Sequence, residues 1–325
     1  CIQNNYVGWL NGSKPGKPVM SPSVVKEWIA PIVKSEDRLF VFMVDNLRFD
    51  QWKIILSALE EYYHLEQEEI YCSILPSATQ YARNAFFAGL MPSEIEKLFP
   101  KYWMNEDEEG TKNQYEAELL AEQLKRLGID VKCGFHKILN LTAAKKLVDN
   151  LSNFMQNKLN VVVYNFVDML SHSRTEMEVL KELADDEAAY RSLTLTWFEH
   201  SPLLDIIRVL AAKKIPVIFT TDHGSIKVQN PSKVIGDKNT NTNLRYKTGR
   251  NLQFEKQEVF EIRNPYDVFL PKANISSSFI FAKENRFFAY PNNFNYYVNY
   301  YRDTFQHGGI SMEEMMIPFA YLKPR

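Results

Sequence analysis

Hydrophobic runs and stretches of helical periodicity alternate along most of the chain. The first run, Leu39–Val44, is continuous and bounded by charged residues, which is the pattern of a strand buried on both faces of a sheet. After it, Trp52, Ile55, Leu56 and Leu59 recur at the spacing of one helix face. Strand and helix patterns then repeat in turn, which predicts an α/β fold with a central, mainly parallel sheet flanked by helices.

The predicted elements cover most of residues 38–325. Strands are expected at residues 39–44, 69–77, 130–134, 161–167, 217–221 and 316–322. Helices are expected at residues 51–63, from Thr79 onward, and at 115–127, 141–157, 175–204 and 202–213. Residues 93–125 include the charged segment MNEDEEG and are predicted to begin as a surface loop.

Two parts of the chain lack this alternation. Residues 1–37 are polar and contain several glycines and prolines, so we expect a linker or entry segment with a short helix near residues 23–34. Residues 225–300 are rich in Asn, Lys, Tyr and Phe, and we expect a cap or insertion of short strands and loops there. The rest of residues 38–325 is predicted to form one domain.

Composition restricts the class of protein. The chain has 325 residues, of which 45% are apolar, and a net charge of −2, so no global field draws it to nucleic acid or to an anionic membrane. Its three cysteines form neither a disulfide framework nor a zinc knuckle, which indicates a reducing, cytoplasmic location. No stretch approaches the roughly 20 apolar residues of a membrane span. Because the chain starts at Cys1, we expect it to be part of a longer protein.

Three of the predicted strands end in an aspartate: Asp45, Asp168 and Asp222. Ligands bind at the carboxyl edge of parallel sheets, because loops from several strands converge there. Three carboxylates in one cleft would repel one another and would raise one another's pKa. A bound cation removes that cost, so the strand ends predict a metal site.

Histidines accompany these aspartates. His172 follows Asp168 by four residues, a spacing that places both on one helix face. His223 is adjacent to Asp222, and His307 precedes two glycines that permit a tight turn. Such oxygen and nitrogen ligands suit Zn²⁺, with Mn²⁺ or Fe as alternatives. Seven candidate ligands, counting Thr79, exceed one tetrahedral ion and suggest two ions that clamp a phosphoryl group.

Thr79 is the predicted nucleophile. It stands where a strand gives way to a helix, and a helix N-terminus offers N–H groups to a phosphate. Metal coordination makes its alkoxide accessible. Arg83 and Asn84, in the first turns of that helix, are candidate substrate contacts. Ser77 is a rival nucleophile, and the ten-residue step from Thr79 to Gly89 favours Thr79.

The order of these residues resembles the alkaline phosphatase superfamily: an Asp, a Ser/Thr nucleophile, Asp-x-x-x-His, Asp-His and a late His. Within it, the segments VDNLRFDQW, PSATQYARN and HGGISMEEMMIP resemble PglZ domains, with Asn46 where a glycine is more usual. The resemblance covers roughly residues 38–325 and implies an alkaline-phosphatase-like sandwich. It implies one ion held by Asp45, Asp222 and His223 beside Thr79, and a second ion held by Asp168, His172 and His307. It also implies attack by Thr79, a phosphothreonine intermediate and hydrolysis by water.

The PglZ domains that this chain most resembles are the effector domains of PorX-type response regulators of the type IX secretion system. That resemblance implies an N-terminal receiver domain, missing here, whose phosphorylation by a sensor histidine kinase regulates this domain. Whether the domain forms a homodimer stays an open question at this point.

Several alternatives stay open. Arg48, Asp50 and Arg83 form salt bridges more often than substrate contacts in such positions, so Arg48 and Arg83 are the weaker candidates for binding substrate. No arginine or third-metal set is placed to neutralise a terminal phosphate, which favours diesters, namely nucleotides or short oligonucleotides. The alternatives are a phosphomonoesterase or phosphomutase, and a metal-bound signalling output module that binds a partner with little catalysis. Cys72 does not occupy the nucleophile position, which argues against a sulfatase.

Overall fold

The computed structural model describes the chain apart from residues 1, 107, 185, 238–239 and 273–275. It divides into two compact units, each built from three segments. We call the first the sheet unit; it comprises Val25–Tyr71, Leu124–Gly224 and Met316–Arg325. The second contains the helix that begins at Thr79, α4, and we call it the α4 unit. It comprises Cys1–Val24, Cys72–Gln123 and Ser225–Met315.

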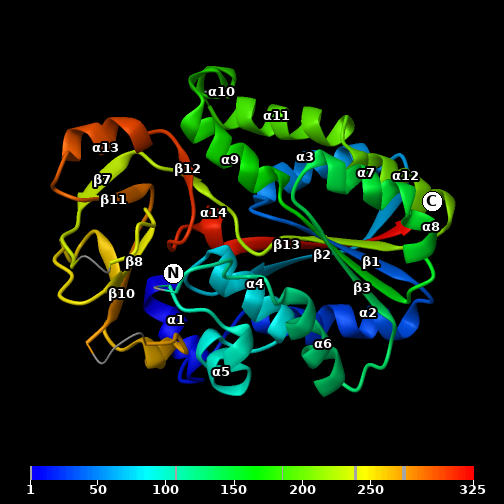
Figure 1. Ribbon diagram of the computed structural model, residues 1–325, viewed down its shortest axis with the longest axis horizontal. Helices are drawn as coiled ribbons and strands as arrows, with labels where there is room; N and C mark the ends of the chain where they lie inside the picture. Colours follow the sequence, from blue (N-terminus) through cyan, green and yellow to red (C-terminus); the bar gives the residue numbers. More distant parts are fainter. Residues whose placement is uncertain (1, 107, 185, 238–239, 273–275) are drawn as a thin grey trace. The chain divides into compact units, whose positions relative to one another are not determined.

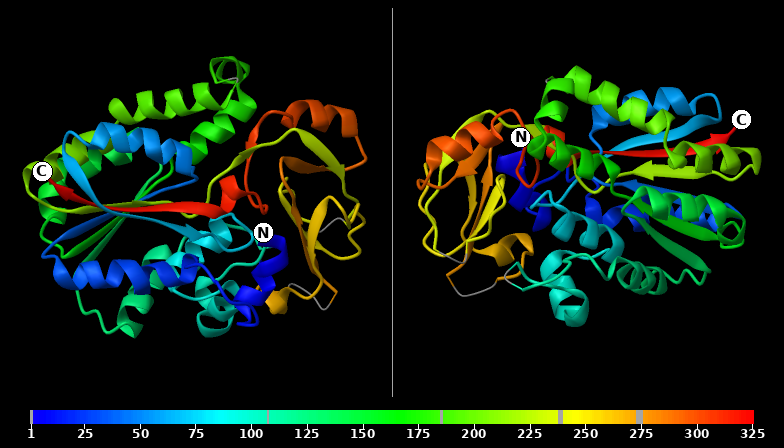
Figure 2. Two further views of the ribbon diagram at one scale, coloured as in Figure 1. Left: turned by 180° about the vertical axis from the view of Figure 1, so that it is seen from behind. Right: turned by 45° about the horizontal axis from the view of Figure 1, so that its top comes forward.

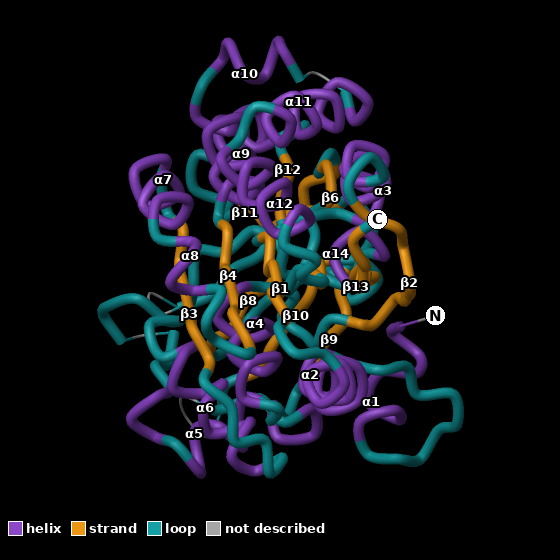
Figure 3. Tube along the Cα trace, turned by 90° about the vertical axis from the view of Figure 1, so that its right-hand side faces the viewer, coloured by secondary structure: helices purple, strands orange, loops and turns teal. Residues whose placement is uncertain are grey.

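The sheet unit is built on a six-stranded sheet of order β2-β13-β5-β1-β4-β3. Its strands are β1 (Leu39–Val44), β2 (Tyr63–Cys72), β3 (Cys133–Ile138), β4 (Leu159–Tyr164), β5 (Val217–Thr220) and β13 (Met316–Pro324). β1 pairs in parallel with β4 and β5, and β3 pairs in parallel with β4, whereas β13 runs antiparallel to β5. Figure 3 shows β3, β4, β1, β13 and β2 in this order across the sheet. The predicted α/β class with a mainly parallel central sheet is therefore confirmed.

Helices cover both faces of this sheet (Figures 1 and 2). The helices of this unit are η2 (Val25–Ile29), α2 (Ala30–Ser35), α3 (Phe49–Leu59), α7 (Leu141–Asp149), α8 (Leu151–Phe154), α9 (Phe166–Glu176), α10 (Glu178–Leu183), α11 (Glu187–Glu199) and α12 (Pro202–Ala212). The apolar stripes of α3, α7 and α12 pack on alternate residues of β1, such as Phe40 and Phe42, and form one large core. On the other face, Trp28 of η2 packs against Phe319 of β13, with ring centroids 5.0 Å apart.

The α4 unit contains α4 (Thr79–Ala88) and the segment that follows β5. Its other elements are α1 (Ile2–Leu10), η1 (Ser21–Ser23), α5 (Pro92–Leu98), η3 (Pro100–Tyr102), most of α6 (Glu116–Arg126), β6 (Ile226–Lys227), β7 (Asn230–Lys233), β8 (Tyr246–Gly249), β9 (Val259–Ile262), η4 (Pro265–Val268), β10 (Ser278–Ala282), β11 (Arg286–Ala289), α13 (Phe294–Tyr301), β12 (Phe305–Gln306) and α14 (Met312–Met315). β8, β10 and β9 form a three-stranded sheet, and β11 pairs with β7 and β12 with β6. Short strands therefore occur in the described part of residues 225–300, as predicted, together with η4 and most of α13, which were not predicted. That this segment is a cap or insertion, and that residues 1–37 form a linker, stay predictions.

Four predicted boundaries were wrong. The helix expected at residues 51–63 ends at Leu59, because the chain turns into β2, whose exposed and charged residues hide its strand character. β4 ends at Tyr164 and not at residue 167, so Asp168 lies in the first turn of α9. The strand expected at residues 130–134 is β3, several residues later. The expected loop at residues 93–125 starts with the short helix α5, which has Pro92 at its N-terminus and a capping bond from Met91 N–H to Glu94.

The helices that the structure describes include none with the length and hydropathy needed to cross a membrane.

Candidate metal and nucleophile site

Two neighbouring strands of the sheet place a pair of buried carboxylates at their carboxyl ends. Asp45 follows β1, and its backbone N–H donates to the carbonyl of Tyr164 at the end of β4 (2.9 Å). Asp222 follows β5 by one residue. Because β1 lies between β5 and β4 in parallel register, these three strand ends meet at one edge. Asp45 is 1% exposed and Asp222 is fully buried. Burial of two charged carboxylates together is costly unless a cation pairs with them.

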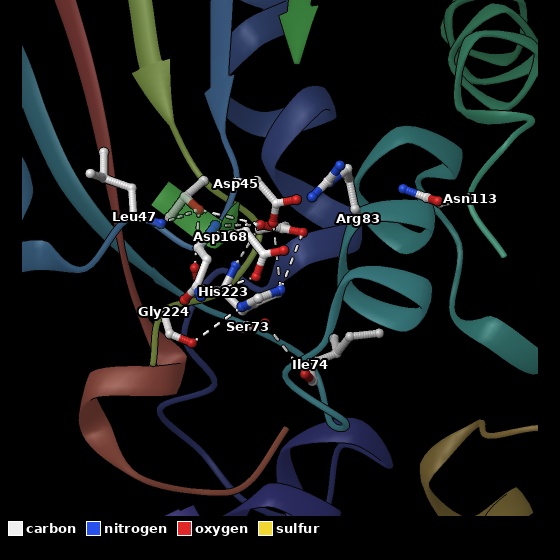
Figure 4. A network of polar contacts seen from close by, with 12 residues as sticks. Asp45, Leu47, Ser73, Ile74, Arg83, Asn113, Asp168, His223 and Gly224 are labelled. Carbon is white, nitrogen blue, oxygen red and sulfur yellow. Dashed lines mark hydrogen bonds and ion pairs between the residues drawn. The ribbon is translucent and has the colours of Figure 1, made fainter. Parts of the chain in front are cut away.

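His223 completes this group, which we call the first ligand cluster: Asp45, Asp222 and His223. One ligand atom of each lies within 4.8 Å of the others. His223 Nε2 is 3.6 Å from Asp222 Oδ2 and 3.8 Å from Asp45 Oδ1 (Figure 4). Its Nδ1 is 3.2 Å from the carbonyl of Gly224, an acceptor, so Nδ1 carries the proton in the neutral ring and Nε2 presents a lone pair to the carboxylates. This is the arrangement of a histidine that ligates a metal. The donor set fits Zn²⁺ or Mn²⁺.

A second pair of candidate ligands lies on α9. His172 Nε2 is 3.6 Å from Asp168 Oδ2, as their four-residue spacing on one helix predicts. The Asp168 side chain is 18% exposed and that of His172 is 62% exposed. This pair is therefore accessible to solvent, whereas the first ligand cluster is buried. We call Asp168 and His172 the second ligand pair. Figure 4 shows Asp168 on the same side of the sheet edge as Asp45 and His223.

Thr79 is the first residue of α4 in the α4 unit. Residues 80–88 of this helix are all buried, whereas Thr79 is partly exposed. The N-cap residue is Ala78, whose methyl group cannot accept a capping hydrogen bond from the first turn of the helix. The hydroxyl of the rival nucleophile, Ser77, is buried and donates to the carbonyl of Gly309 (2.8 Å). Because the Ser77 hydroxyl is engaged in this structural bond, Thr79 is favoured as the nucleophile. The choice between the two residues stays a prediction.

His307 lies after β12 in a loop that several contacts fix. Gly308 has φ +119°, and a Cβ there would lie 2.5 Å from the ring of Tyr246, so only glycine fits. Both oxygens of the buried Glu314 accept backbone N–H bonds, from Gly309 (2.8 Å) and Ser311 (2.9 Å).

Arg245 pairs with Glu314 through two bonds, of 2.9 and 2.7 Å, and both side chains are fully buried. Burial acts to raise the pKa of Glu314, but the charge of Arg245 and these hydrogen bonds hold it below its usual value. Sequence reasoning missed this support. The only local sign of it in the sequence is a glutamate that lies among methionines in the run SMEEMM.

The three predicted substrate contacts all have protein partners. Arg83 is fully buried, with Nη1 3.6 Å from the carboxylate of Glu116. Asn84 Nδ2 donates to the carbonyl of Lys112 (3.0 Å). Arg48 is 5% exposed and bonds to Asp50 and Glu187, on α3 and α11. Their roles in substrate binding stay predictions, whereas the salt bridges expected for Arg48 and Arg83 are present.

A buried lysine lies in the same unit as Thr79. Lys247 is 2% exposed, and its Nζ donates to the carbonyl of Asn241 (2.8 Å) and lies 4.7 Å from the ring centroid of Tyr290. Burial lowers its pKa to about 7, and the charge of Glu106 partly opposes this. Glu106 in turn accepts hydrogen bonds from the hydroxyls of Tyr81, two residues after Thr79, and Tyr246.

The sheet unit also has an apolar cavity of about 350 Å³ beside the ends of β3 and β4. Phe166 and Trp197 line it and stack in parallel, with centroids 3.8 Å apart. Phe166 and Met169 reach it from α9, three residues apart, whereas Asp168 and His172 of the same helix do not line it.

Comparisons with known proteins identify the class. Two solved structures share the fold: human ectonucleotide pyrophosphatase/phosphodiesterase 5 (TM-score 0.53, 10% identity, 87% of each chain covered) and an inactive variant of the murine protein in complex with AMP (TM-score 0.52, 11% identity, 88% of each chain covered). A search of the curated proteins finds no match. The chain is an alkaline-phosphatase-like phosphoester hydrolase domain. Residues 24–322 match the family described as the BREX system PglZ alkaline phosphatase-like domain, and the chain belongs to that PglZ family.

Proposed function

We propose that this domain is a metal-dependent phosphodiesterase that cleaves nucleotides or short oligonucleotides. The observation that carries the proposal is the first ligand cluster, in which two buried carboxylates and a histidine lone pair face one another within 4.8 Å. Such a group is stable with a cation and unfavourable without one. Two Zn²⁺ ions per chain are proposed, with Mn²⁺ as the alternative.

Each predicted residue has a role in this mechanism. Asp45, Asp222 and His223 would hold the first ion, and the second ligand pair together with His307 would hold the second. The ions lower the pKa of a coordinated hydroxyl or water and neutralise charge on the phosphate. Thr79 Oγ attacks phosphorus in line, and the bond from phosphorus to the leaving alcohol breaks. Water then attacks the phosphothreonine from the opposite side, releasing the phosphate product and restoring the Thr79 hydroxyl.

The charges of the candidate substrate contacts favour a diester. A monoester dianion needs an additional free cation, but the guanidinium groups of Arg83 and Arg48 already face carboxylates. A diester carries one negative charge and needs less neutralisation. The AMP bound to the murine protein of the same fold supports a nucleotide substrate. Among the predicted contacts to phosphate oxygens, Asn84 is the stronger candidate, and Arg83 and Arg48, which already face carboxylates, are the weaker ones.

The test compares bis-p-nitrophenyl phosphate with p-nitrophenyl phosphate, using the purified chain and elemental analysis for zinc. We expect zinc-dependent diester hydrolysis that Thr79→Ala abolishes while zinc is retained, and that Thr79→Ser keeps in part. Ser77→Ala is the matched control, because it removes the rival hydroxyl and a bond to Gly309. Activity retained in Thr79→Ala and lost in Ser77→Ala would reverse the assignment of the nucleophile.

Other outcomes lead to the alternatives. Bound zinc without turnover of either ester favours the signalling output module. Faster monoester cleavage favours a phosphomonoesterase, and transfer of the phosphoryl group to a second hydroxyl favours a phosphomutase. The resemblance to PorX-type response regulators supports the further proposal that a receiver domain and a sensor histidine kinase control this domain in the cytoplasm, in type IX secretion.

A further inference from the structure

Asn46 follows Asp45 at the end of β1 and is fully buried. Its backbone is left-handed, with φ 62°, a conformation that asparagine adopts more readily than most residues other than glycine. Glycine would satisfy the turn equally well. The side chain therefore needs an explanation beyond the backbone, and its contacts supply one.

Asn46 touches carboxylates of both ligand groups in the sheet unit. Its backbone N–H faces Asp222 Oδ1 at 3.5 Å, the long end of the range for a hydrogen bond, and shares that oxygen with the His223 N–H at 3.0 Å. Its side-chain Nδ2 donates to Asp168 Oδ1 at 3.3 Å. One residue thus links the first ligand cluster to the second ligand pair.

The remaining oxygen of each carboxylate faces a histidine. Asp222 Oδ2 lies 3.6 Å from His223 Nε2, and Asp168 Oδ2 lies 3.6 Å from His172 Nε2. In both cases Asn46 contacts Oδ1, whereas the oxygen that pairs with the histidine ring is Oδ2. A hydrogen bond to one oxygen fixes the rotation of a carboxylate, so the other oxygen is presented in one direction.

The amide also carries a cost. Asn46 Oδ1 is buried and lacks a hydrogen-bond partner within the described part of the chain. Buried acceptors without partners are unfavourable, and a glycine at this position would avoid the penalty. The bond from Nδ2 to Asp168 is the compensating contact that the structure shows, together with a longer approach to Ser171 Oγ at 3.4 Å.

We propose that Asn46 is a positioning residue that orients Asp168 through its side chain and Asp222 through its backbone, and so sets the two ion sites relative to each other. The inference rests on the proposed function, because it assumes that these aspartates bind ions. It assigns separate effects to the two parts of Asn46: the side chain acts on the second site, and the backbone N–H acts on the first.

Asn46→Gly tests this separation, because it keeps the left-handed turn and the backbone N–H and removes only the amide. Zinc affinity is measured by competition with a chromophoric chelator on the metal-free chain, and stoichiometry by elemental analysis. We expect two ions in the wild type. In Asn46→Gly we expect one site to keep its affinity within about threefold and the other to weaken about 10- to 100-fold, the usual effect of losing a residue that orients a ligand.

Ser171→Ala is the matched control, since it removes the other acceptor near Nδ2 and leaves the bond to Asp168 intact. We expect both of its sites to match the wild type. A second readout is diester hydrolysis against zinc concentration: excess zinc restores turnover in Asn46→Gly, whereas damage to the fold alone would not respond to zinc.

Equal affinities in Asn46→Gly and wild type, or equal weakening of both sites, would overturn the inference and leave the proposed function standing. A wild-type chain that takes up no zinc or manganese would overturn the proposed function itself, and with it the basis of the inference.

Discussion

The hydroxyl of Ser77 donates a hydrogen bond to the carbonyl oxygen of Gly309, at 2.8 Å. This bond joins the turn that precedes Thr79 to the loop that follows His307, within the α4 unit. The two segments are 232 positions apart in the chain, so no local pattern relates them. Within the α4 unit, this hydrogen bond therefore links the backbone segment that carries Thr79 to the segment that carries His307.

That loop depends on the buried pair of Arg245 and Glu314. Glu314→Gln keeps the shape of the side chain but leaves the guanidinium without its counter-charge. We expect the free energy of unfolding to fall by about 3–5 kcal/mol, as when other buried pairs lose one partner. Urea denaturation measures it. Glu313→Gln is the control, because Glu313 is exposed, and it should change stability by no more than about 0.5 kcal/mol. Equal effects of the two changes would contradict the structure.

The same glutamate predicts a response to acid. The pKa of Glu314 is lowered from 4.5 in the folded chain. A lowered carboxyl pKa contributes stability that is fully present above pH 4.5 and is lost as the pH falls below that value and through the folded pKa. Glu314→Gln should lose less stability than the wild type over that acid interval. If the unfolding free energies of the wild type and of Glu314→Gln change equally between pH 6 and pH 4, Glu314 makes no such contribution.

Removal of metal should destabilise the sheet unit. Asp45 and Asp222 are buried beside each other, and an ion that binds only the folded chain stabilises it by about 2.7 kcal/mol at 100 times its dissociation constant. We expect a chelator to lower the melting temperature and added zinc to restore it. Asp45→Asn should reduce this response. A melting temperature that neither chelator nor zinc alters would count against the first ligand cluster as a metal site.

The buried Lys247 predicts that the free energy of unfolding depends on pH above neutrality. Burial lowers its pKa to about 7 from 10.5, so between these values the unfolded chain holds a proton that the folded chain lacks. Stability should therefore rise with pH across this interval, by at most about 1.4 kcal/mol per pH unit. Unfolding free energies at pH 7, 8 and 9 measure the slope. Lys247→Met should flatten it, and Lys256→Met, at an exposed position, should not.

Substitution of Arg48 distinguishes a structural role of this residue from a role in substrate binding. Its bonds to Asp50 and Glu187 connect α3 with α11, and hydrogen bonds to charged groups contribute about 1.5–3 kcal/mol each. We expect Arg48→Met to lower the free energy of unfolding by at least that amount and to leave the KM for the diester within about twofold. A tenfold rise in KM at unchanged stability would instead identify Arg48 as a substrate contact.

The sequence predicted best where a strand is buried on both faces. β1, β4 and β5 are continuous apolar runs, so all three strands were predicted; β1 ends at Val44 as expected and β5 ends within one residue of its expected end, whereas β4 ends three residues early. β2 was misjudged because it is an edge strand of the sheet and its middle is exposed, so charged residues interrupt its hydrophobic pattern. α5 was missed because a helix of seven residues shows too little periodicity.

The contacts that support the candidate site could not be predicted. Arg245 and Glu314 are 69 residues apart, and Asn46 and Asp168 are 122 apart. Such pairs follow from the packing of elements and leave no mark on local composition. Asn46 had one sequence signal, its place where PglZ domains more usually have glycine, but its two carboxylate contacts became visible only in the fold.

The position of β13 bears on how the molecule is made. This strand lies inside the sheet, between β2 and β5, yet it comes from residues 316–324. During synthesis the ribosome releases it after every other strand of that sheet, so until then β5 and β2 present unpaired backbone edges. Open edges of this kind favour association between chains. Until residues 316–324 are made, Asp222 already follows β5, but the neighbouring strand that covers this edge of β5 is still missing.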